Sequence, residues 1–366
     1  MSAFAGPSMI ENGLVFAYDM NNINKSWKGA PITNEAKNAS NQVDWSVSGL
    51  LQSVSRTTVI ADEVYNISST TGTGTSFRIY FANAVLTNGA TYTVSYRYKI
   101  TSGGPLFRAN DWCDTSITRV TTDLGGGVFY ETATGTRATY DATFRFLDFE
   151  ISNNTVVQIW DLQLELGSSA TPYSSTRVRS NTQAILDLTR LNTITTTSLT
   201  YNSNNTFRFA GTDSIATTYV PINTAGSVSV WFKINAHKDF NTIFDNALGA
   251  NDWEFWVYST GAARFRSTAD NGDYILDSDV LLTGIYYNFV ITWSSTEAIL
   301  YKNGVFMSQD ITVGTKVTPG VMYFGGGNAG NTKLDGELPC AFAYNRVLSS
   351  AEVKQNFNAL RGRFGI

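Results

Sequence analysis

One strand pattern in this chain is interrupted. The stretch Gly13–Asp19 (GLVFAYD) has the pattern of the first strand of a β-sandwich, but its continuation comes only at Ile185–Gly211, from ILDLTRLN to FRFAG. A second, self-contained set of strand patterns fills the residues between them. An insertion into a surface loop is physically easy when its two ends lie close together. We therefore predict one sandwich built from both ends of the chain and a second one inserted into it.

The composition favours strands over helices. Charged residues make up 15% of the 366 residues and aromatic residues 13%, and Thr, Ser, Asn and Gly are abundant. Alternation of apolar and polar residues marks strands at Tyr92–Ile100 and Val156–Leu166, and in the second we expect Trp160, Leu162, Leu164 and Leu166 to share one face. At Ala298–Met307, Asn303-Gly304 predicts a hairpin with a type I′ turn.

One helix is expected at the C-terminus. Ser349-Ser350-Ala351-Glu352 has the spacing of a capping box, and Val353, Phe357 and Leu360 then follow at helical spacing. Gly362 suits the end of this helix. The predicted fold class is therefore all-β, with two β-sandwich (jelly-roll) domains, one inserted in the other, and a short C-terminal helix.

Charge, cysteines and the first residues exclude several classes. The net charge of −4 offers no electrostatic footprint for nucleic acid or an anionic membrane, and no apolar run is long enough to span a bilayer. Cys113 and Cys340 lie in different blocks and are expected as free, buried thiols. The start MSAFAGPSMIENG lacks the features of a secretory signal, so folding in a cytoplasm is expected.

A series of short motifs resembles a known family. From about Ile185 to Leu360 the chain is similar to the laminin-G-like, concanavalin A-type lectin/glucanase sandwich. The matching pieces, in order, are FRFAG at Phe207–Gly211, SVSVWFKI at Ser227–Ile234, YYNFVITW at Tyr286–Trp293, LYKNGV at Leu300–Val305 and the closing segment Leu334–Leu360. The final NFNALRGRFGI resembles the tail of such domains in virion proteins of tailed phages, especially T4-like myoviruses.

The inserted block resembles a different module. Trp160–Tyr173 (WDLQLELGSSATPY) is similar to the closing motif of the jelly rolls of carbohydrate-binding modules found in phage tail proteins. The resemblances imply a laminin-G-like sandwich at 13–32 plus 180–366 and an inserted jelly roll at 33–179. Residues 1–12 are polar and without periodicity, which suits a docking arm.

The sequence offers little for catalysis. A retaining glycosidase needs two carboxylates about 5 Å apart, and the nearest match, Asp161 and Glu165, is better explained as the solvated face of an edge strand. His237 is the only histidine and has no nucleophile motif near it. The glycine triplets at 125–127 and 325–327 lack the residues that follow in phosphate-binding loops and are expected to form turns.

Carbohydrate binding is better supported, because sugar rings stack on aromatic side chains while planar polar groups bind their hydroxyls. Alternation places Trp253 and Phe255 on one face and Trp256 and Tyr258 on the other, so only part of this segment can face a ligand. The candidate binding residues are Trp253, Trp256, Tyr258, Asn251 and Asp252 in the C-terminal part, and Trp112, Asp111 and Trp45 in the inserted block.

No cofactor is expected. Calcium is an open alternative because Asp270, Asp273, Asp277 and Asp279 cluster, although their spacing is not that of an EF-hand and a solvated turn explains them as well.

The resemblances point to a non-enzymatic bacteriophage virion surface protein, assembled in the host cytoplasm, that displays lectin-like domains for weak attachment to host glycans. It would be a capsid decoration or a tail-fibre component, with other virion proteins bound through the N-terminal arm. Open alternatives are a purely structural cement protein of the capsid or tail and a glycan-cleaving hydrolase. Assembly into a homo-oligomer is also left open.

Overall fold

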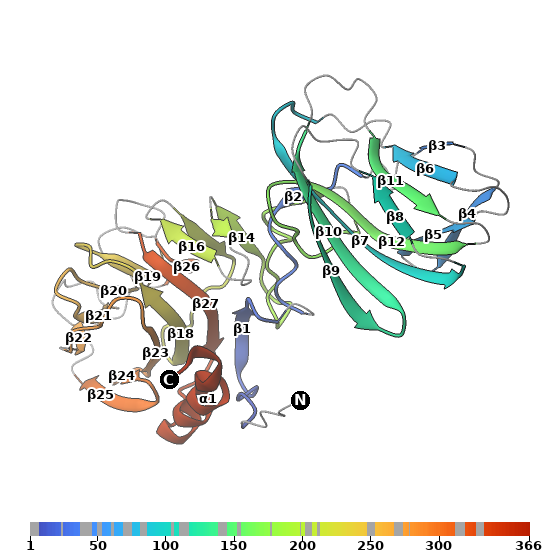
Figure 1. Cartoon of the computed structure of the whole chain (residues 1–366). Helices are drawn as coiled ribbons and strands as arrows, with labels where there is room; N and C mark the ends of the chain where they lie inside the picture. Colours follow the sequence, from blue (N-terminus) through green and yellow to red (C-terminus); the bar gives the residue numbers. More distant parts are fainter. Residues whose placement is uncertain are drawn as a thin grey trace. The chain divides into compact units, whose positions relative to one another are not determined.

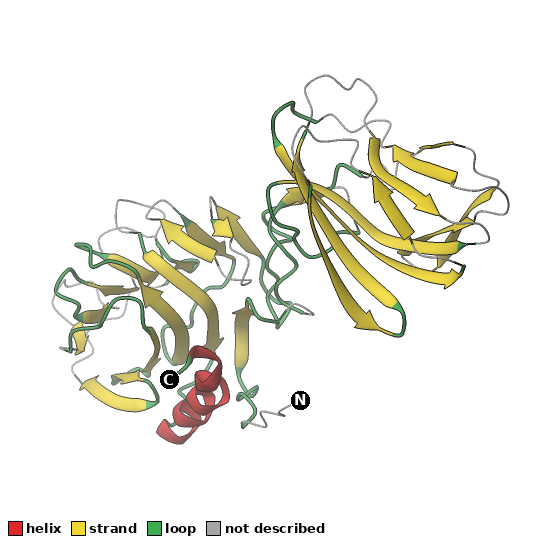
Figure 2. Cartoon of the chain, in the orientation of Figure 1, coloured by secondary structure: helices red, strands yellow, loops and turns green. Residues whose placement is uncertain are grey.

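The computed structural model describes most of the chain. The described residues are all except 1–6, 23–24, 37–45, 50–52, 60–61, 69–74, 81–85, 104–105, 110–116, 138–144, 152–154, 176–177, 198, 202–206, 211–212, 247–252, 267–273, 278, 312–318 and 327–332. They form many strands and a single long helix, so the predicted all-β class is confirmed (Figures 1 and 2). In the described part of the chain, no helix is long and apolar enough to cross a membrane.

The chain divides into two compact units, which we call unit 1 (Met1–Gly29 with Asn181–Ile366) and unit 2 (Ala30–Ser180). The two ends of unit 2 pair with each other, because β2 (Ile32–Thr33) runs antiparallel to β13 (Val178–Arg179). The two segments of unit 1 also meet just outside them, where Trp27 bridges Ile185. Both ends of the insertion therefore lie together.

Unit 1 contains two sheets. The order of the first is β15-β16-β27-β18-β23-β24-β25, with β1 paired to β27 as well. Its strands are β1 (Leu14–Asp19), β15 (Thr200–Tyr201), β16 (Phe207–Ala210), β18 (Gly226–Ile234), β23 (Tyr286–Trp293), β24 (Ala298–Lys302), β25 (Val305–Asp310) and β27 (Asp335–Tyr344). The first strand of the chain thus completes a sheet whose other strands all follow the insertion.

The second sheet of unit 1 has the order β14-β17-β26-β19-β20-β21-β22. Its strands are β14 (Ile194–Thr197), β17 (Ser214–Thr217), β19 (Asn241–Asp245), β20 (Glu254–Val257), β21 (Ala263–Arg266), β22 (Tyr274–Asp277) and β26 (Tyr323–Phe324). Aromatic rings fill the space between the two sheets. Phe16 of β1 stacks on Phe324 of β26 at 5.5 Å, and Phe255 of β20 meets Phe289 of β23 at 5.2 Å between ring centroids.

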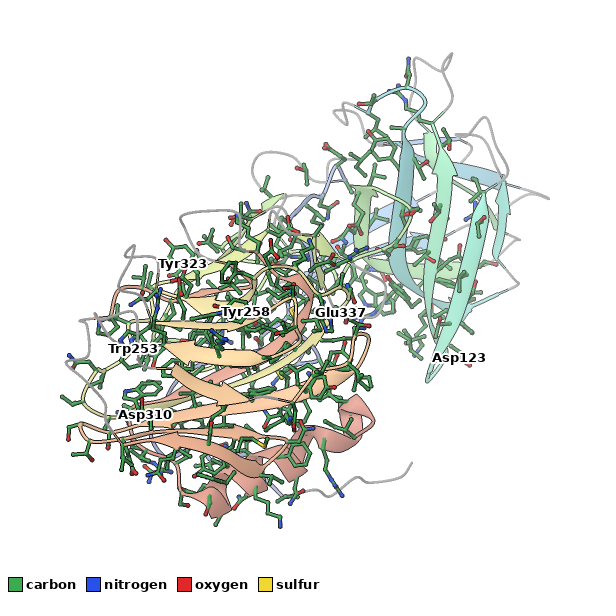
Figure 3. The ribbon with its side chains drawn as sticks, turned by 90° about the vertical axis from the view of Figure 1, so that its left-hand side faces the viewer. Asp123, Trp253, Tyr258, Asp310, Tyr323 and Glu337 are labelled. Carbon is green, nitrogen blue, oxygen red and sulfur yellow. The ribbon has the colours of Figure 1, made fainter. Side chains whose placement is uncertain are left out.

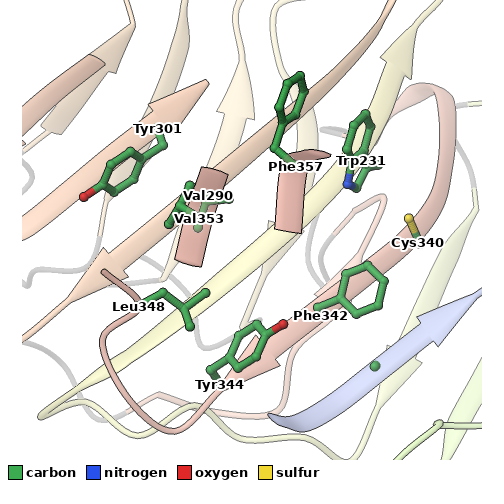
Figure 4. Close-up of a cluster of buried hydrophobic side chains, with 10 residues drawn as sticks. Trp231, Val290, Tyr301, Cys340, Phe342, Tyr344, Leu348, Val353 and Phe357 are labelled. Atoms are coloured by element: carbon green, nitrogen blue, oxygen red, sulfur yellow. The ribbon is translucent and has the colours of Figure 1, made fainter. Parts of the chain in front are cut away.

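The helix α1 (Ser350–Phe364) covers the other face of the eight-stranded sheet. Trp231 stacks on Phe357 at 5.7 Å and on Phe364 at 4.3 Å between ring centroids (Figure 4). The predicted capping box between Ser349 and Glu352 is present. The prediction of a stop at Gly362 is wrong: the helix continues to Phe364 because that ring packs on the sheet, and the left-handed cap is Gly365.

The first described residues lie on this helix. The backbone N–H of Ile10 donates to Asn356 at 2.8 Å, and Gln355 donates to the carbonyl of Ser8 at 2.9 Å. Met9 and Ile10 pack against the same apolar cluster as α1. Ser8–Asn12 therefore belong to unit 1, and the docking arm at residues 1–12 stays a prediction.

Unit 2 is a sandwich of a six-stranded and a four-stranded sheet, with orders β4-β5-β12-β7-β10-β9 and β3-β6-β11-β8. Tyr92, Val94, Tyr96, Val157 and Ile159 are buried on the inner face of the larger sheet. The strands are β3 (Ser46–Gly49), β4 (Ser53–Val59), β5 (Asp62–Ser68), β6 (Thr75–Tyr80), β7 (Thr91–Ser102), β8 (Leu106–Ala109), β9 (Thr118–Gly125), β10 (Val128–Thr136), β11 (Arg145–Ile151) and β12 (Val156–Leu166).

The strand β12 differs from its sequence pattern. Its pairing with β7 shifts by one residue between Trp160 and Gln163, which is a β-bulge. Trp160 therefore pairs with Arg97 on the face opposite the buried Leu162 and Leu164, and the expectation that these residues share one face is wrong. A bulge depends on cross-strand pairing, so alternation within one strand cannot reveal it.

The two cysteines differ in how far the structure describes them. Cys340 is a buried, free thiol in β27, beneath α1. Burial raises the pKa of this thiol well above its usual value, so it stays protonated. Cys113 lies outside the described residues.

Candidate functional site

Three predicted binding residues lie on or beside β20, on the second sheet of unit 1. In the register of this sheet, Trp256 pairs with Thr242 of β19 and Arg264 of β21, and Glu254 pairs with Arg266. Residues that pair directly across antiparallel strands project from the same face. The face is the outer one, because Phe255 and Phe265, which alternate with these residues, are buried between the sheets.

An aromatic–arginine cluster occupies this outer face; its members are Phe240, Trp256, Tyr258, Arg264 and Arg266. Phe240 lies 5.0 Å from Tyr258 and 6.4 Å from Trp256 between ring centroids. The Arg264 guanidinium lies 4.2 Å above the Tyr258 ring and donates to its hydroxyl at 3.3 Å. Arg266 lies 5.7 Å from the Trp256 ring. Each arginine thus extends one aromatic ring with a planar group of donors.

The rings of Phe240, Trp256 and Tyr258 differ in how far they are exposed to solvent. Phe240 is 38% exposed and Tyr258 is partly exposed, whereas Trp256 is only 4% exposed and lies beneath its neighbours. Trp256 therefore supports the cluster, and the rings of Phe240 and Tyr258 offer the surface that a ligand can reach. Arg266 is held by Glu254 at 2.9 Å, which fixes the edge of this surface.

Trp253 is not part of this cluster, because it is buried in the core of unit 1. It precedes β20, whereas Tyr258 follows it; both residues are labelled in Figure 3. The ring of Trp253 meets Trp293 edge-on at 4.7 Å between centroids. Only 1% of Trp253 is exposed, so its burial leaves no ring face for a ligand, and it acts as a core residue. Asn251 and Asp252, predicted beside it, lie outside the described residues.

The predicted candidates of the inserted block, Trp45, Asp111 and Trp112, also lie outside the described residues. Phe240, Arg264 and Arg266 were not predicted from the sequence. The alternation in Ala263–Arg266 (ARFR) does place both arginines on one face of a short strand, but nothing in the sequence brings Phe240 beside them.

The carboxylates considered for catalysis are buried. The prediction that Asp161 and Glu165 form the solvated face of an edge strand is wrong, since the two residues are only 9% and 1% exposed. Asp161 pairs with Arg97 at 2.6 Å. Glu165 accepts hydrogen bonds from the backbone N–H and the hydroxyl of Thr171 at 2.7 and 2.9 Å. Burial raises the pKa of Glu165.

These bonds give the closing motif of the inserted block a structural role. The segment Gly167–Ser174, which we call the latch, folds back over the end of β12. Gln163 accepts from the backbone N–H of Ser174 at 2.7 Å and donates to Thr171, while Arg179 donates to the carbonyl of Pro172. The Gln and Glu of the motif therefore hold the outgoing chain at the point where unit 2 ends.

The remaining polar candidates have ordinary structural partners. A ring nitrogen of His237 lies 2.8 Å from the carbonyl oxygen of Leu281. Asp279 pairs with Lys302 at 2.7 Å, Asp270 and Asp273 lie outside the described residues, and the side chain of Asp277 is not described. Among the residues that the structure describes, no group of three or more His, Cys, Asp or Glu side chains could hold a metal ion.

Comparison with known families identifies part of unit 1. Residues 209–354 match the family described as the concanavalin A-like lectin/glucanases superfamily, of the laminin G type. This part of unit 1 is therefore similar to a concanavalin A-like lectin/glucanase domain, and the aromatic–arginine cluster lies within the matched residues. No curated protein sequence matches the chain.

Several solved structures are similar to parts of the chain at low identity. The receptor-binding domain of botulinum neurotoxin D is 18% identical, with a TM-score of 0.39 over 50% of this chain and 51% of that one. A sialidase of Trypanosoma rangeli is 11% identical, with a TM-score of 0.40 over 83% and 62%. The carbohydrate-binding module of a Ruminococcus gnavus sialidase is 12% identical, with a TM-score of 0.32 over 36% and 81%. The chain spans about half the length of the neurotoxin domains that it matches, and likenesses at this level say nothing about its function.

Proposed function

We propose that this chain is a non-enzymatic carbohydrate-binding protein, and that unit 1 binds glycans at the aromatic–arginine cluster. The observation that carries the proposal is the partly exposed Phe240–Tyr258 ring pair beside the guanidinium of Arg264, on the outer face of a lectin-type sandwich. Aromatic rings stack on the apolar faces of sugars, and guanidinium groups donate to their hydroxyls. The cluster supplies both kinds of contact.

The non-enzymatic part of the proposal rests on how the carboxylates are used. Asp161 and Glu165 are buried in bonds to Arg97 and to the latch, so neither is placed to meet a scissile bond. Incubating the chain with any polysaccharide that it binds should release no reducing ends. Release that disappears in a carboxylate variant would overturn this part.

Binding is tested with the full chain on an array of glycans, followed by titration calorimetry on the best ligands. Phe240→Ala and Tyr258→Ala should each weaken binding by about tenfold, the usual cost of removing a central aromatic contact. Phe306→Ala is the matched control, because this ring is 52% exposed on β25 of the other sheet. Equal affinities for all variants and the parent chain would contradict the assignment of the site.

We further propose that the chain is displayed on the surface of a bacteriophage virion, where many weak sites act together through avidity. This proposal rests on the resemblance of the C-terminal motifs to tailed-phage virion proteins. Immunogold electron microscopy of purified particles tests it: label on the head would indicate a capsid decoration, and label on the tail a fibre component. Particles without label would refute the virion role without touching the glycan-binding proposal.

A further inference from the structure

A second aromatic surface lies on unit 2, created by the bulge in β12. The strands β12, β7 and β10 are neighbours in the larger sheet (Figure 1). Trp160 pairs with Arg97 of β7, which in turn pairs with Tyr130 of β10, so the three side chains share one face. This face is the outer one, because the alternating residues Ile159 and Tyr98 are buried inside the sandwich. We call the three residues the Trp160 face.

The backbone at the bulge is unusual. Asp161 has a φ of 53°, a left-handed conformation that non-glycine residues rarely adopt. The conformation directs its carboxylate to the guanidinium of Arg97 at 2.6 Å. Such outliers cost conformational free energy and gather at functional sites. Here the bulge holds Arg97, whose side chain is still 45% exposed, beside Trp160.

The Trp160 face carries polar groups suited to hydroxyls. Gln158 lies two residues before Trp160 and donates to Asn66 of β5 at 2.9 Å, which holds two amide groups next to the ring. In the described part of the chain the indole N–H of Trp160, which is half-buried, has no hydrogen-bond partner. It is therefore available to a ligand.

The surface is bounded on one side. Further along the same face Thr93, Ser95, Gln163 and Glu165 are buried where the latch crosses the sheet. Trp160, Arg97 and Tyr130 lie beyond the latch and stay at least partly exposed. A ligand on this part of the sheet would thus meet an aromatic floor with the latch beside it.

We propose that the Trp160 face is a second carbohydrate site, which takes a neutral hexose ring independently of the cluster on unit 1. The ring would stack on Trp160, and the exposed guanidinium of Arg97, held in place by Asp161, would donate to adjacent hydroxyls. A neutral sugar fits because the charge of Arg97 is already matched by Asp161. The chain would then carry two sites.

The test is native affinity electrophoresis of the full chain in gels that contain neutral polysaccharides: amylose, mixed-linkage β-glucan or galactomannan. Trp160→Ala should raise the dissociation constant for at least one of them by about tenfold. Leu124→Ala is the control, because this side chain is 50% exposed on β9 of the same sheet. No retardation of the parent chain by any gel, or equal retardation of Trp160→Ala, would overturn the proposal.

Two further variants distinguish a binding role of the Trp160 face from a structural role of Asp161 and from binding at unit 1. The variant Asp161→Gly fits the positive φ and removes the carboxylate, so binding should fall while the melting temperature of unit 2 is kept. If Asp161 had a purely structural role, the same variant would lower the melting temperature and leave binding unchanged. Tyr258→Ala should leave the Trp160-dependent retardation in place. Retardation abolished by Tyr258→Ala and unaffected by Trp160→Ala would refute the second site and support the first.

Discussion

Replacing Asp187 by alanine should destabilise unit 1 and leave unit 2 intact. Asp187 follows the insertion, is 2% exposed, and accepts hydrogen bonds from five donors. One donor is the backbone N–H of Ala17 in β1, at 2.9 Å, and the others belong to Thr189 and Asn192. This carboxylate therefore joins the segment before the insertion to the segment after it.

The cost can be worked from these contacts. A buried donor left without an acceptor costs about 1–3 kcal/mol, and a hydrogen bond to a charged group contributes about 1.5–3 kcal/mol. Ala17 is fully buried, so water cannot replace the lost acceptor, whereas the partly exposed Thr189 and Asn192 can be hydrated. We expect a loss of about 3–5 kcal/mol, a large share of the roughly 5–15 kcal/mol typical of a domain.

The assay is urea unfolding of the full chain followed by hydrogen exchange, which reports peptides of the two units separately. Asp187→Asn should cost nearly as much as Asp187→Ala, because its amide would turn an N–H group toward the existing donors. Asp279→Ala is the control in the same unit, since its carboxylate is 65% exposed and its pair with Lys302 should contribute under about 1 kcal/mol. A loss below about 1 kcal/mol for Asp187→Ala, or equal losses in both units, would refute the reasoning.

Three other predictions concern the insertion and two carboxylates. Replacing Ala30–Ser180 by a short glycine linker should leave a cooperatively melting unit 1, because Trp27 and Ile185 already meet there; calorimetry without a transition would contradict this. Burial raises the pKa of Glu165 above its usual 4.5, so the stability of unit 2 should fall as pH rises from 4.5 through the raised value, and Glu165→Gln should flatten that slope in a pH series of melting temperatures. Arg346 lowers the pKa of Glu352 to about 2, so the docking of α1 should be intact above pH 4.5 and weaken as pH falls toward 2. Glu352→Gln should weaken it already at neutral pH, as measured by hydrogen exchange of the helix.

Features encoded by a few neighbouring residues were predictable. Asn303 and Gly304 have the positive φ values of 52° and 75° that a type I′ turn requires, and the capping box of Ser349 and Glu352 forms as its spacing indicates. The alternation around β20 also gives the faces of Trp256 and Phe255. In each case the groups that interact lie within a few positions of one another, so the pattern carries the information.

Features that depend on distant partners were not predictable. The bulge at Trp160 exists only in the pairing of β12 with β7, the extension of α1 past Gly362 follows from Phe364 packing on Trp231, and Trp253 is buried by Trp293. The aromatic–arginine cluster likewise needs Phe240 to fold against Tyr258.

The sequence by itself determined the all-β class, because apolar alternation and turn residues act locally. Only the tertiary structure decided which aromatic rings remain on the surface. Exposure is set by what packs on a side chain, and here those neighbours come from strands and loops far away in the chain.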